Sequence, residues 1–317
     1  MSQGKIEERI RWLRDLARTG PEAEVLPVLG RALRDRASLL VAGAARLTAE
    51  GGHAVLVPDL LQAFDRLFQN PVRSDPKCWG KTAIVRALAA LEYDQSPPFV
   101  RGSGHVQMEA VWGGREDTAA ELRASSFLAL AACTDIGRGE ILRRLVDAMT
   151  DAADPVRLEV VRAVAGMGGD EAALLLRLKA RMGDGRPRVT GQVFDAVLGV
   201  ESERGLGFVA GYLAAAAPET RDEAAFALGA SRMPGAIDRL IATAKETADP
   251  EFRGVLLRAL SASGRPPAID FLLDLVRNGP ERDARLALDA LGLHDASPEI
   301  REQVEAARKT RSRTPEP

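Results

Sequence analysis

The apolar positions of the chain follow the period of amphipathic helices, and proline and glycine interrupt them at regular intervals. In one stretch, an apolar stripe begins after Asp154-Pro155 and ends at Gly168, and a second stripe runs from Asp170 to Gly183. Proline suits the first turn of a helix, because its φ is already helical and its missing N–H is not needed there, whereas glycine commonly ends helices. This stretch therefore predicts a unit of two helices joined by a turn.

The unit recurs along the chain. Prolines at positions 155, 187, 218, 250 and 280 are 32, 31, 32 and 30 residues apart, and arginines at 123, 157, 188, 221, 253 and 285 keep steps of 31 to 34. Two short amphipathic helices cannot bury their apolar faces alone, whereas stacked pairs form a continuous core. We therefore predict an all-α protein, a right-handed α-solenoid of eight or nine helix pairs with a concave groove lined by the second helices. The recurring arginine is interpreted as structural, bridging to an acid or a carbonyl of the next repeat.

The punctuation of the unit resembles that of a known repeat family. The Asp-Pro-x-x-Arg start and the sequence Ala227-Leu228-Gly229 resemble HEAT repeats, specifically the short bacterial repeats of the phycobilisome-lyase-like family, over residues 118–308. The resemblance implies a HEAT-like solenoid. It implies no single function, because such repeats serve many unrelated roles.

The rest of the chain departs from this regular pattern. Residues 1–94 contain helical stripes with weaker punctuation, as expected of end repeats that expose a polar face. Residues 309–317 are polar and charged without an apolar face, which predicts a disordered tail. Residues 95–117 form an irregular inserted segment, because Pro97, Pro98, Gly102 and Gly104 leave room for only a short helix.

Two interpretations of the irregular segment remain open. In the first, it is a loop over the groove that contacts a partner, because irregular segments inside repeats are often functional and Trp and Arg are enriched at binding hot spots. Its candidate contact residues are His105, Gln107, Glu109, Trp112, Arg115 and Asp117. In the second interpretation, Trp112 is a buried plug that fills the gap of a missing helix, and Asp117 caps the helix that begins at Thr118.

The remaining candidates lie on the second helices of the regular repeats, where we expect partner contacts from Arg177, Arg181, Tyr212 and Arg239. Acidic residues such as Asp238 and Asp270 are mixed with these arginines, and the net charge of the chain is −2. A track for phosphates would need a consistently basic surface, so nucleic acid is not the favoured partner.

The sequence offers little for catalysis. The three histidines are far apart, the two cysteines lie in unrelated contexts, and neither a phosphate-binding loop nor a nucleophile motif is present. We therefore expect no metal and no cofactor. The N-terminus has no secretory pattern, and no apolar stretch is long enough for a bilayer, which predicts a cytoplasmic protein without a membrane partner.

Taken together, these features favour a non-catalytic scaffold or adaptor that binds another protein through its groove and the 105–117 segment. One alternative, implied by the family resemblance, is a bilin-lyase-like enzyme or a chaperone for a tetrapyrrole protein. Another is a HEAT-like protein that binds nucleic acid. A visible absorbance band would favour the former alternative, and steeply salt-dependent DNA binding would favour the latter.

Overall fold

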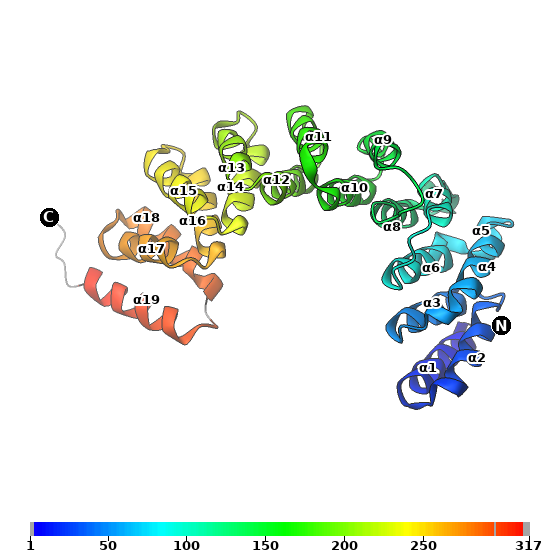
Figure 1. The fold of residues 1–317 in the computed structure, drawn as a ribbon. Coiled ribbons are helices and arrows are strands. Elements are labelled where there is room, and N and C mark those ends of the chain that lie inside the picture. Colours follow the sequence, from blue (N-terminus) through cyan, green and yellow to red (C-terminus); the bar gives the residue numbers. More distant parts are fainter. Residues whose placement is uncertain (1–2, 295, 313–317) are drawn as a thin grey trace. The chain divides into compact units, whose positions relative to one another are not determined.

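The computed structural model describes residues 3–294 and 296–312, which divide into two compact units, residues 1–167 and 168–317 (Figure 1). The α-helices of unit 1 are α1 (Gln3–Thr19), α2 (Glu22–Leu33), α3 (Ser38–Glu50), α4 (Val57–Leu67), α5 (Pro71–Ser74), α6 (Trp79–Ala90), α7 (Pro97–Ser103), α8 (Ala120–Leu130), α9 (Arg138–Ala148) and α10 (Asp154–Met167). Unit 1 also contains two 3-10 helices, η1 (Ala54–Leu56) and η2 (Pro76–Cys78), and two strands, β1 (Met108–Val111) and β2 (Gly114–Asp117).

Unit 2 is entirely helical in its described residues. Its α-helices are α11 (Gly169–Met182), α12 (Pro187–Glu201), α13 (Glu203–Ala210), α14 (Pro218–Ser231), α15 (Pro234–Glu246), α16 (Pro250–Ser263), α17 (Pro266–Asn278), α18 (Glu281–Leu291) and α19 (Pro298–Arg311), with the 3-10 helices η3 (Gly211–Ala214) and η4 (Gly292–His294). No helix in the described part of the chain is both long and apolar enough to cross a membrane.

The helices alternate as pairs along the chain. Unit 1 holds the pairs α1/α2, α3/α4, α6/α7 and α8/α9 followed by α10, and unit 2 holds α11 followed by α12/α13, α14/α15, α16/α17 and α18/α19. Helices α12, α14 and α16 each begin at the proline that the repeat pattern places there. The predicted all-α solenoid of paired helices is therefore confirmed.

Within each unit, the first helices of successive pairs stack directly on one another. In unit 1, α3 packs against α6, α6 against α8, and α8 against α10; in unit 2, α12, α14, α16 and α18 pack in the same way. Small residues permit this close approach. At Gly229 of α14, an added Cβ would lie 2.4 Å from the carbonyl oxygen of Ala259 in α16. The helices therefore meet backbone to backbone at this point.

Replacing Gly229 with alanine is expected to lower the free energy of unfolding by about 1–3 kcal/mol, the usual cost of overpacking against a backbone that must move. Gly199→Ala is the matched control, because Gly199 ends the equivalent stretch of α12 and its added Cβ would have nothing within 4 Å. The control should be stabilised by up to about 1 kcal/mol, since alanine is the better helix former. Urea denaturation compares the two; equal stability of both variants would contradict the close approach.

At Arg123, Arg221 and Arg253, the recurring arginine bridges successive repeats, as predicted. Arg123 donates to Asp151 at 3.0 Å, and Arg253 binds both carboxylate oxygens of Asp283 at 3.0 Å. Arg221 donates to one carboxylate oxygen of Asp249, Oδ2, at 2.9 Å. At these three positions the arginine thus links a first helix to the segment that starts the next repeat, whereas Arg157 binds the carbonyls of Asp151 and Ala152, which precede its own helix.

The C-terminal segment differs from the expectation of a disordered tail from residue 309. Helix α19 continues to Arg311, because the guanidinium of Arg311 binds the carbonyl of Gly279 at 2.7 Å and the carboxylate of Glu281 at 2.9 Å. The remaining residues of the predicted tail, 313–317, lie outside the described residues.

Candidate functional site

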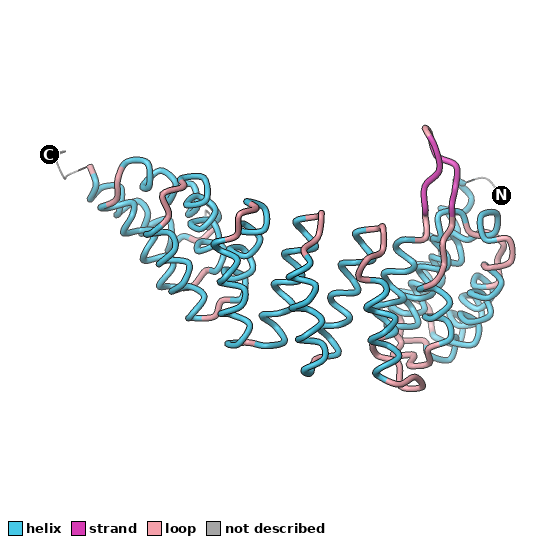
Figure 2. Tube along the Cα trace, turned by 90° about the horizontal axis from the view of Figure 1, so that it is seen from above, coloured by secondary structure: helices cyan, strands magenta, loops and turns pink. Residues whose placement is uncertain are grey.

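A β-hairpin projects from unit 1 between α7 and α8 (Figure 2). Strands β1 and β2 pair antiparallel, with Val111 opposite Gly114, and Trp112 and Gly113 form the turn. Gly113 has a φ of +92°, which a residue with a side chain rarely adopts. The 105–117 segment, predicted to be an irregular loop, is therefore an ordered hairpin.

The tip of the hairpin is apolar and open to solvent. The Trp112 side chain is fully exposed, at 104% of its reference area, and Val106, Met108 and Val111 are also exposed. The plug interpretation is therefore wrong for Trp112. It fails because the gap does not exist: α7 packs against α8, and its Phe99 is completely buried.

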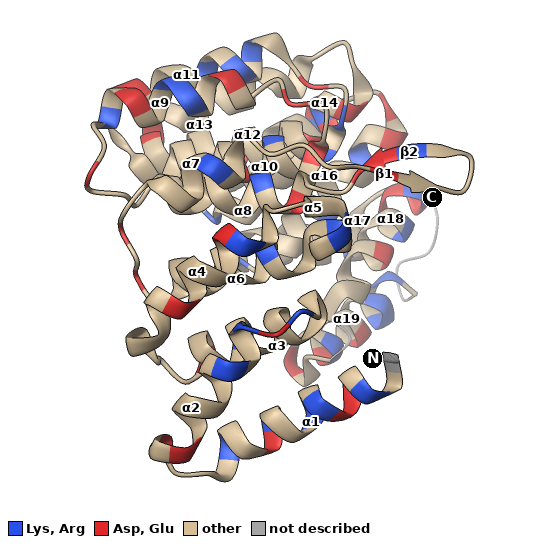
Figure 3. Ribbon diagram, turned by 90° about the vertical axis from the view of Figure 1, so that its right-hand side faces the viewer, with Lys and Arg blue, Asp and Glu red and all other residues tan. Residues whose placement is uncertain are grey.

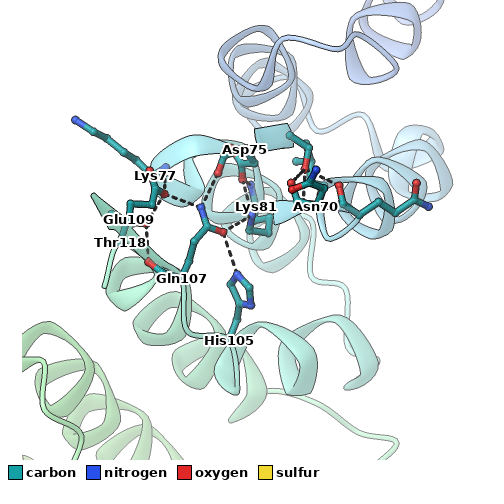
Figure 4. A network of polar contacts seen from close by, with 12 residues as sticks. Asn70, Asp75, Lys77, Lys81, His105, Gln107, Glu109 and Thr118 are labelled. Carbon is teal, nitrogen blue, oxygen red and sulfur yellow. Dashed lines mark hydrogen bonds and ion pairs between the residues drawn. The ribbon is translucent and has the colours of Figure 1, made fainter. Parts of the chain in front are cut away.

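A buried polar cluster holds the base of the hairpin against η2 and α6 (Figure 4). The ammonium group of Lys81 lies 3.3 Å from Asp75 Oδ2 and 3.1 Å from Gln107 Oε1, and the Lys81 and Asp75 side chains have no exposed surface. The Gln107 amide also donates to the backbone carbonyl of Asp75 at 2.9 Å. Asp75 in turn accepts the N–H groups of Gly80 and Lys81, so the same carboxylate caps the start of α6.

Glu109 on β1 extends this cluster. Its Oε1 accepts hydrogen bonds from the Thr118 hydroxyl at 2.6 Å, the Gln107 amide at 2.7 Å and the Lys77 N–H at 2.6 Å. Burial opposes ionisation, but these three donors together hold the pKa of the Glu109 carboxyl below its usual value. The carboxylate is therefore charged near neutral pH, and its Oε1 accepts hydrogen bonds from the protein itself.

Asp117 fastens the other strand to the following repeat. Its Oδ1 accepts the N–H groups of Gln107 at 3.0 Å and Ala119 at 3.1 Å, and its Oδ2 pairs with Arg123. Burial raises the pKa of this carboxyl, and the hydrogen bonds and Arg123 outweigh that effect and lower it. The predicted cap is not formed as expected: α8 begins at Ala120 rather than at Thr118, and Asp117 binds the N–H of Ala119, the residue before the helix. Asp117 instead links the hairpin to Arg123, which bridges repeats.

His105 lies under the hairpin. Its ring packs edge-on against Phe68, with centroids 4.8 Å apart, and its Nε2 lies 3.1 Å from Gln107 Oε1. Burial, together with the nearby Lys81 charge, lowers the pKa of the imidazole. A neutral ring that donates Nε2–H to the Gln107 carbonyl oxygen fits both facts.

The hairpin residues predicted to contact a partner therefore divide into two groups. Trp112 and Arg115 are exposed, as a contact residue must be. Gln107 is only 2% exposed, and His105, Glu109 and Asp117 are partly buried and hydrogen-bonded internally. These four are corrected from contact residues to anchors. The reason is the period of a strand, which turns Gln107 and Glu109 to the same face of β1, toward η2 and α6.

An open cavity of about 440 Å³ lies beside the base of the hairpin. Its lining residues come from the first helices α3, α6 and α8 and the segments that precede α6 and α8: Leu39, Ala42, Arg46, Lys77, Trp79, Thr82, Ala83, Arg86, Thr118 and Glu121. Trp79 is 46% exposed, and the Lys77 ammonium lies 5.6 Å from the centre of its ring. The groove was predicted on the second helices; this cavity, which we call the α3–α6–α8 groove, lies on the first helices. The stacking of the first helices explains the difference, because it brings their side chains together on one face.

The second-helix candidates in unit 2 are brought together only in part. The guanidinium groups of Arg177 and Arg181 lie 4.5 and 5.1 Å from the ring centre of Phe208, and Tyr212 packs edge-on against the same ring. Arg177 is also paired with Glu201 at 2.6 Å. Arg239, on α15, is exposed and makes none of these ring contacts. Basic and acidic residues are interspersed along the helices (Figure 3).

Sequence reasoning missed the residues that anchor the hairpin and line the groove. Lys81 carried a usable signal, because it lies on the stripe with Ile84 and Leu88 that α6 buries. A charged residue on a buried stripe requires a partner. Among residues 3–294 and 296–312, no three His, Cys, Asp or Glu side chains gather as they would to hold a metal ion.

A comparison with family models agrees with the repeat architecture over part of unit 2. Residues 207–292 match the family model of HEAT repeats. Among solved structures, an engineered protein has 16% sequence identity and a TM-score of 0.38, covering 98% of this chain and 96% of that chain. Human deoxyhypusine hydroxylase in complex with glycerol has 18% identity and a TM-score of 0.29, covering 92% of this chain and 91% of that chain. No curated protein matches the sequence.

Proposed function

We propose that this HEAT-repeat chain is a non-catalytic scaffold that binds another protein through unit 1. The binding surface comprises the tip of the hairpin and the adjoining α3–α6–α8 groove. The observation that carries the proposal is the position of Trp112, a fully exposed tryptophan at the end of an arm whose base is tied into a buried polar cluster.

The anchoring of the hairpin supports this proposal. An isolated two-stranded hairpin is marginally stable in water, and burying a charge pair such as Asp75–Lys81 carries a desolvation cost. The protein bears both of these free-energy costs to hold an arm that covers little of its own core. A rigid arm loses little conformational entropy when it binds, and a Trp is among the residues that contribute most at interfaces.

The groove supplies a second contact surface next to the arm. Trp79 offers a half-exposed aromatic face, and Lys77 connects the groove to the hairpin, since its N–H binds Glu109 and its ammonium lies over the Trp79 ring. A partner that reaches from Trp112 to Trp79 would contact an apolar centre with a charged rim, which is the usual arrangement of a protein interface.

Site-specific photo-cross-linking tests the proposal. A benzophenone amino acid in place of Trp112 is expected to give a discrete cross-linked protein in extracts of the native organism. The same probe in place of Trp12, which is 55% exposed on α1, is the matched control and should not give that product.

The protein identified in this way is then titrated against Trp112→Ala. We expect the variant to bind at least about 30-fold more weakly, the effect of a hot-spot Trp, while its melting temperature stays at the wild-type value because the lost side chain contacts only water. Identical cross-links from positions 112 and 12, or unchanged affinity of Trp112→Ala, would contradict the proposal.

A further inference from the structure

The hydrogen-bond pattern of the hairpin leaves two free edges. The Thr118 N–H donates to the Gln107 carbonyl at 2.9 Å, so these opposite residues form a hydrogen-bonded pair. Hydrogen-bonded and non-hydrogen-bonded pairs alternate along an antiparallel ladder, so Met108–Asp117 and Ala110–Arg115 are non-hydrogen-bonded pairs. The peptide groups of Met108 and Ala110 therefore point outward from β1, and those of Arg115 and Asp117 point outward from β2. Such an edge is a template for a further strand.

The two edges differ in chemistry. Strand β2 reads Gly-Arg-Glu-Asp, and charged side chains of this kind discourage strand addition. Strand β1 reads Met-Glu-Ala-Val, and its one charge, Glu109, is held inside by three hydrogen bonds. Met108, Ala110 and Val111 are exposed. The edge of β1 therefore lacks exposed charged side chains that would discourage the addition of a further strand.

Few hydrogen bonds from the described residues occupy the outward peptide groups of the β1 edge. The outward carbonyl of Met108 accepts a hydrogen bond from the guanidinium of Arg115 at 3.0 Å, an exposed contact that another donor can replace. By the same register, the peptide group of Ala110 points outward, and Ala110 is an exposed residue. A strand placed along this edge would satisfy the Ala110 N–H and C=O and would pack its apolar side chains beside Met108 and Ala110, which share one face of β1.

The charged residues near the β1 edge indicate which side chains an added strand has besides its apolar ones. The α3–α6–α8 groove next to β1 is lined by three cations, Arg46, Lys77 and Arg86, and one carboxylate, Glu121. Glu121 is already paired with Arg86 at 2.6 Å, which leaves Arg46 and Lys77 without an acid in the groove lining. Acidic side chains on the partner would complement this surface.

We infer that the partner protein adds an extended segment as a third strand along the free edge of β1. In this segment apolar side chains alternate, and acidic residues follow at the end that reaches the groove. This inference rests on the proposed function and specifies the form in which the partner binds. The backbone hydrogen bonds supply affinity, and the exposed Met108 and Ala110 side chains and the groove cations supply selectivity.

A random 12-residue peptide display library, sorted on the purified full-length chain, supplies the probes. Selected peptides are expected to show apolar residues at every second position and an acidic end. Against the best of them, Ala110→Pro should lower affinity at least about tenfold, because proline lacks the outward N–H and disrupts the new ladder. Ala110→Ser, which keeps the outward N–H at the same position, is the matched control and should stay within about twofold of wild type. Hydrogen exchange of residues 105–118 verifies that both variants keep the hairpin.

Several outcomes would overturn the inference. These are the absence of any peptide that binds, selected peptides with the period of a helix, equal loss of affinity in Ala110→Pro and Ala110→Ser, and unchanged affinity in Ala110→Pro. A wild-type dimer that Ala110→Pro dissociates would assign the edge to a second copy of this chain instead. Peptides that require Trp112 for binding but tolerate Ala110→Pro would contradict strand addition and would still agree with the scaffold proposal. A failed cross-link from position 112 tests the scaffold proposal separately.

Discussion

Replacing Lys81 with methionine is expected to destabilise α6 and the base of the hairpin by about 3–5 kcal/mol, the cost of leaving one member of a buried ion pair without its partner. Methionine has a similar volume, so the change removes the charge without opening a cavity. The Asp75 carboxylate, which has no exposed surface, would lose its cation, and Gln107 would lose the donor to its Oε1. Hydrogen exchange of α6 and of residues 105–118 should become about 10²- to 10³-fold faster.

Lys77→Met is the control for this experiment. Lys77 is exposed, lies in η2 four residues before Lys81, and places its ammonium group 5.6 Å from the centre of the Trp79 ring. Its loss should change stability by less than about 0.5 kcal/mol, as for most surface substitutions. A Lys81→Met variant that exchanges no faster than Lys77→Met would show that the cluster does not stabilise the hairpin.

The second large effect is expected at Val161, which is completely buried on α10. Val161→Asp would place a carboxylate in the core without a partner, which costs at least about 4 kcal/mol. Because each repeat depends on its neighbour, the damage should spread to α8, against which α10 packs. We expect little soluble, folded protein, measured by yield and by the urea midpoint of what remains.

Val304→Asp provides the comparison. Val304 is only partly buried on α19, the last helix of unit 2, so the new carboxylate can reach water. The loss should be below about 1 kcal/mol. Equal damage at Val161 and Val304 would argue against a stack in which stability comes from nearest neighbours.

The order of the helices and their punctuation could be predicted from the sequence, because they depend on local properties of the chain. Pro187, Pro218 and Pro250 begin helices because of the φ that proline imposes, and the helical period of the apolar stripes marks the buried faces. The bridging role of Arg253 could also be predicted, because the repeat period places Asp283 of the next repeat beside it.

The candidate site was less accessible to sequence reasoning. Trp112 and Arg115 were correctly selected as exposed candidates from an irregular, aromatic segment. The anchors were misassigned as contacts, since the partners of Gln107 lie 26 and 32 residues away, on Lys81 and Asp75. No local pattern reports such pairs.

By itself, the sequence determined that this protein is a stack of helix pairs, because a repeated local signal specifies every pair in the same way. Only the tertiary structure decided that residues 108–117 form a hairpin, that the first helices line the groove, and that Lys81 is buried. Two four-residue strands, one of them mostly charged, carry too weak a β pattern to be recognised alone. They pair because Gln107, Glu109 and Asp117 are held by residues that the fold brings to them from η2, α6 and α8.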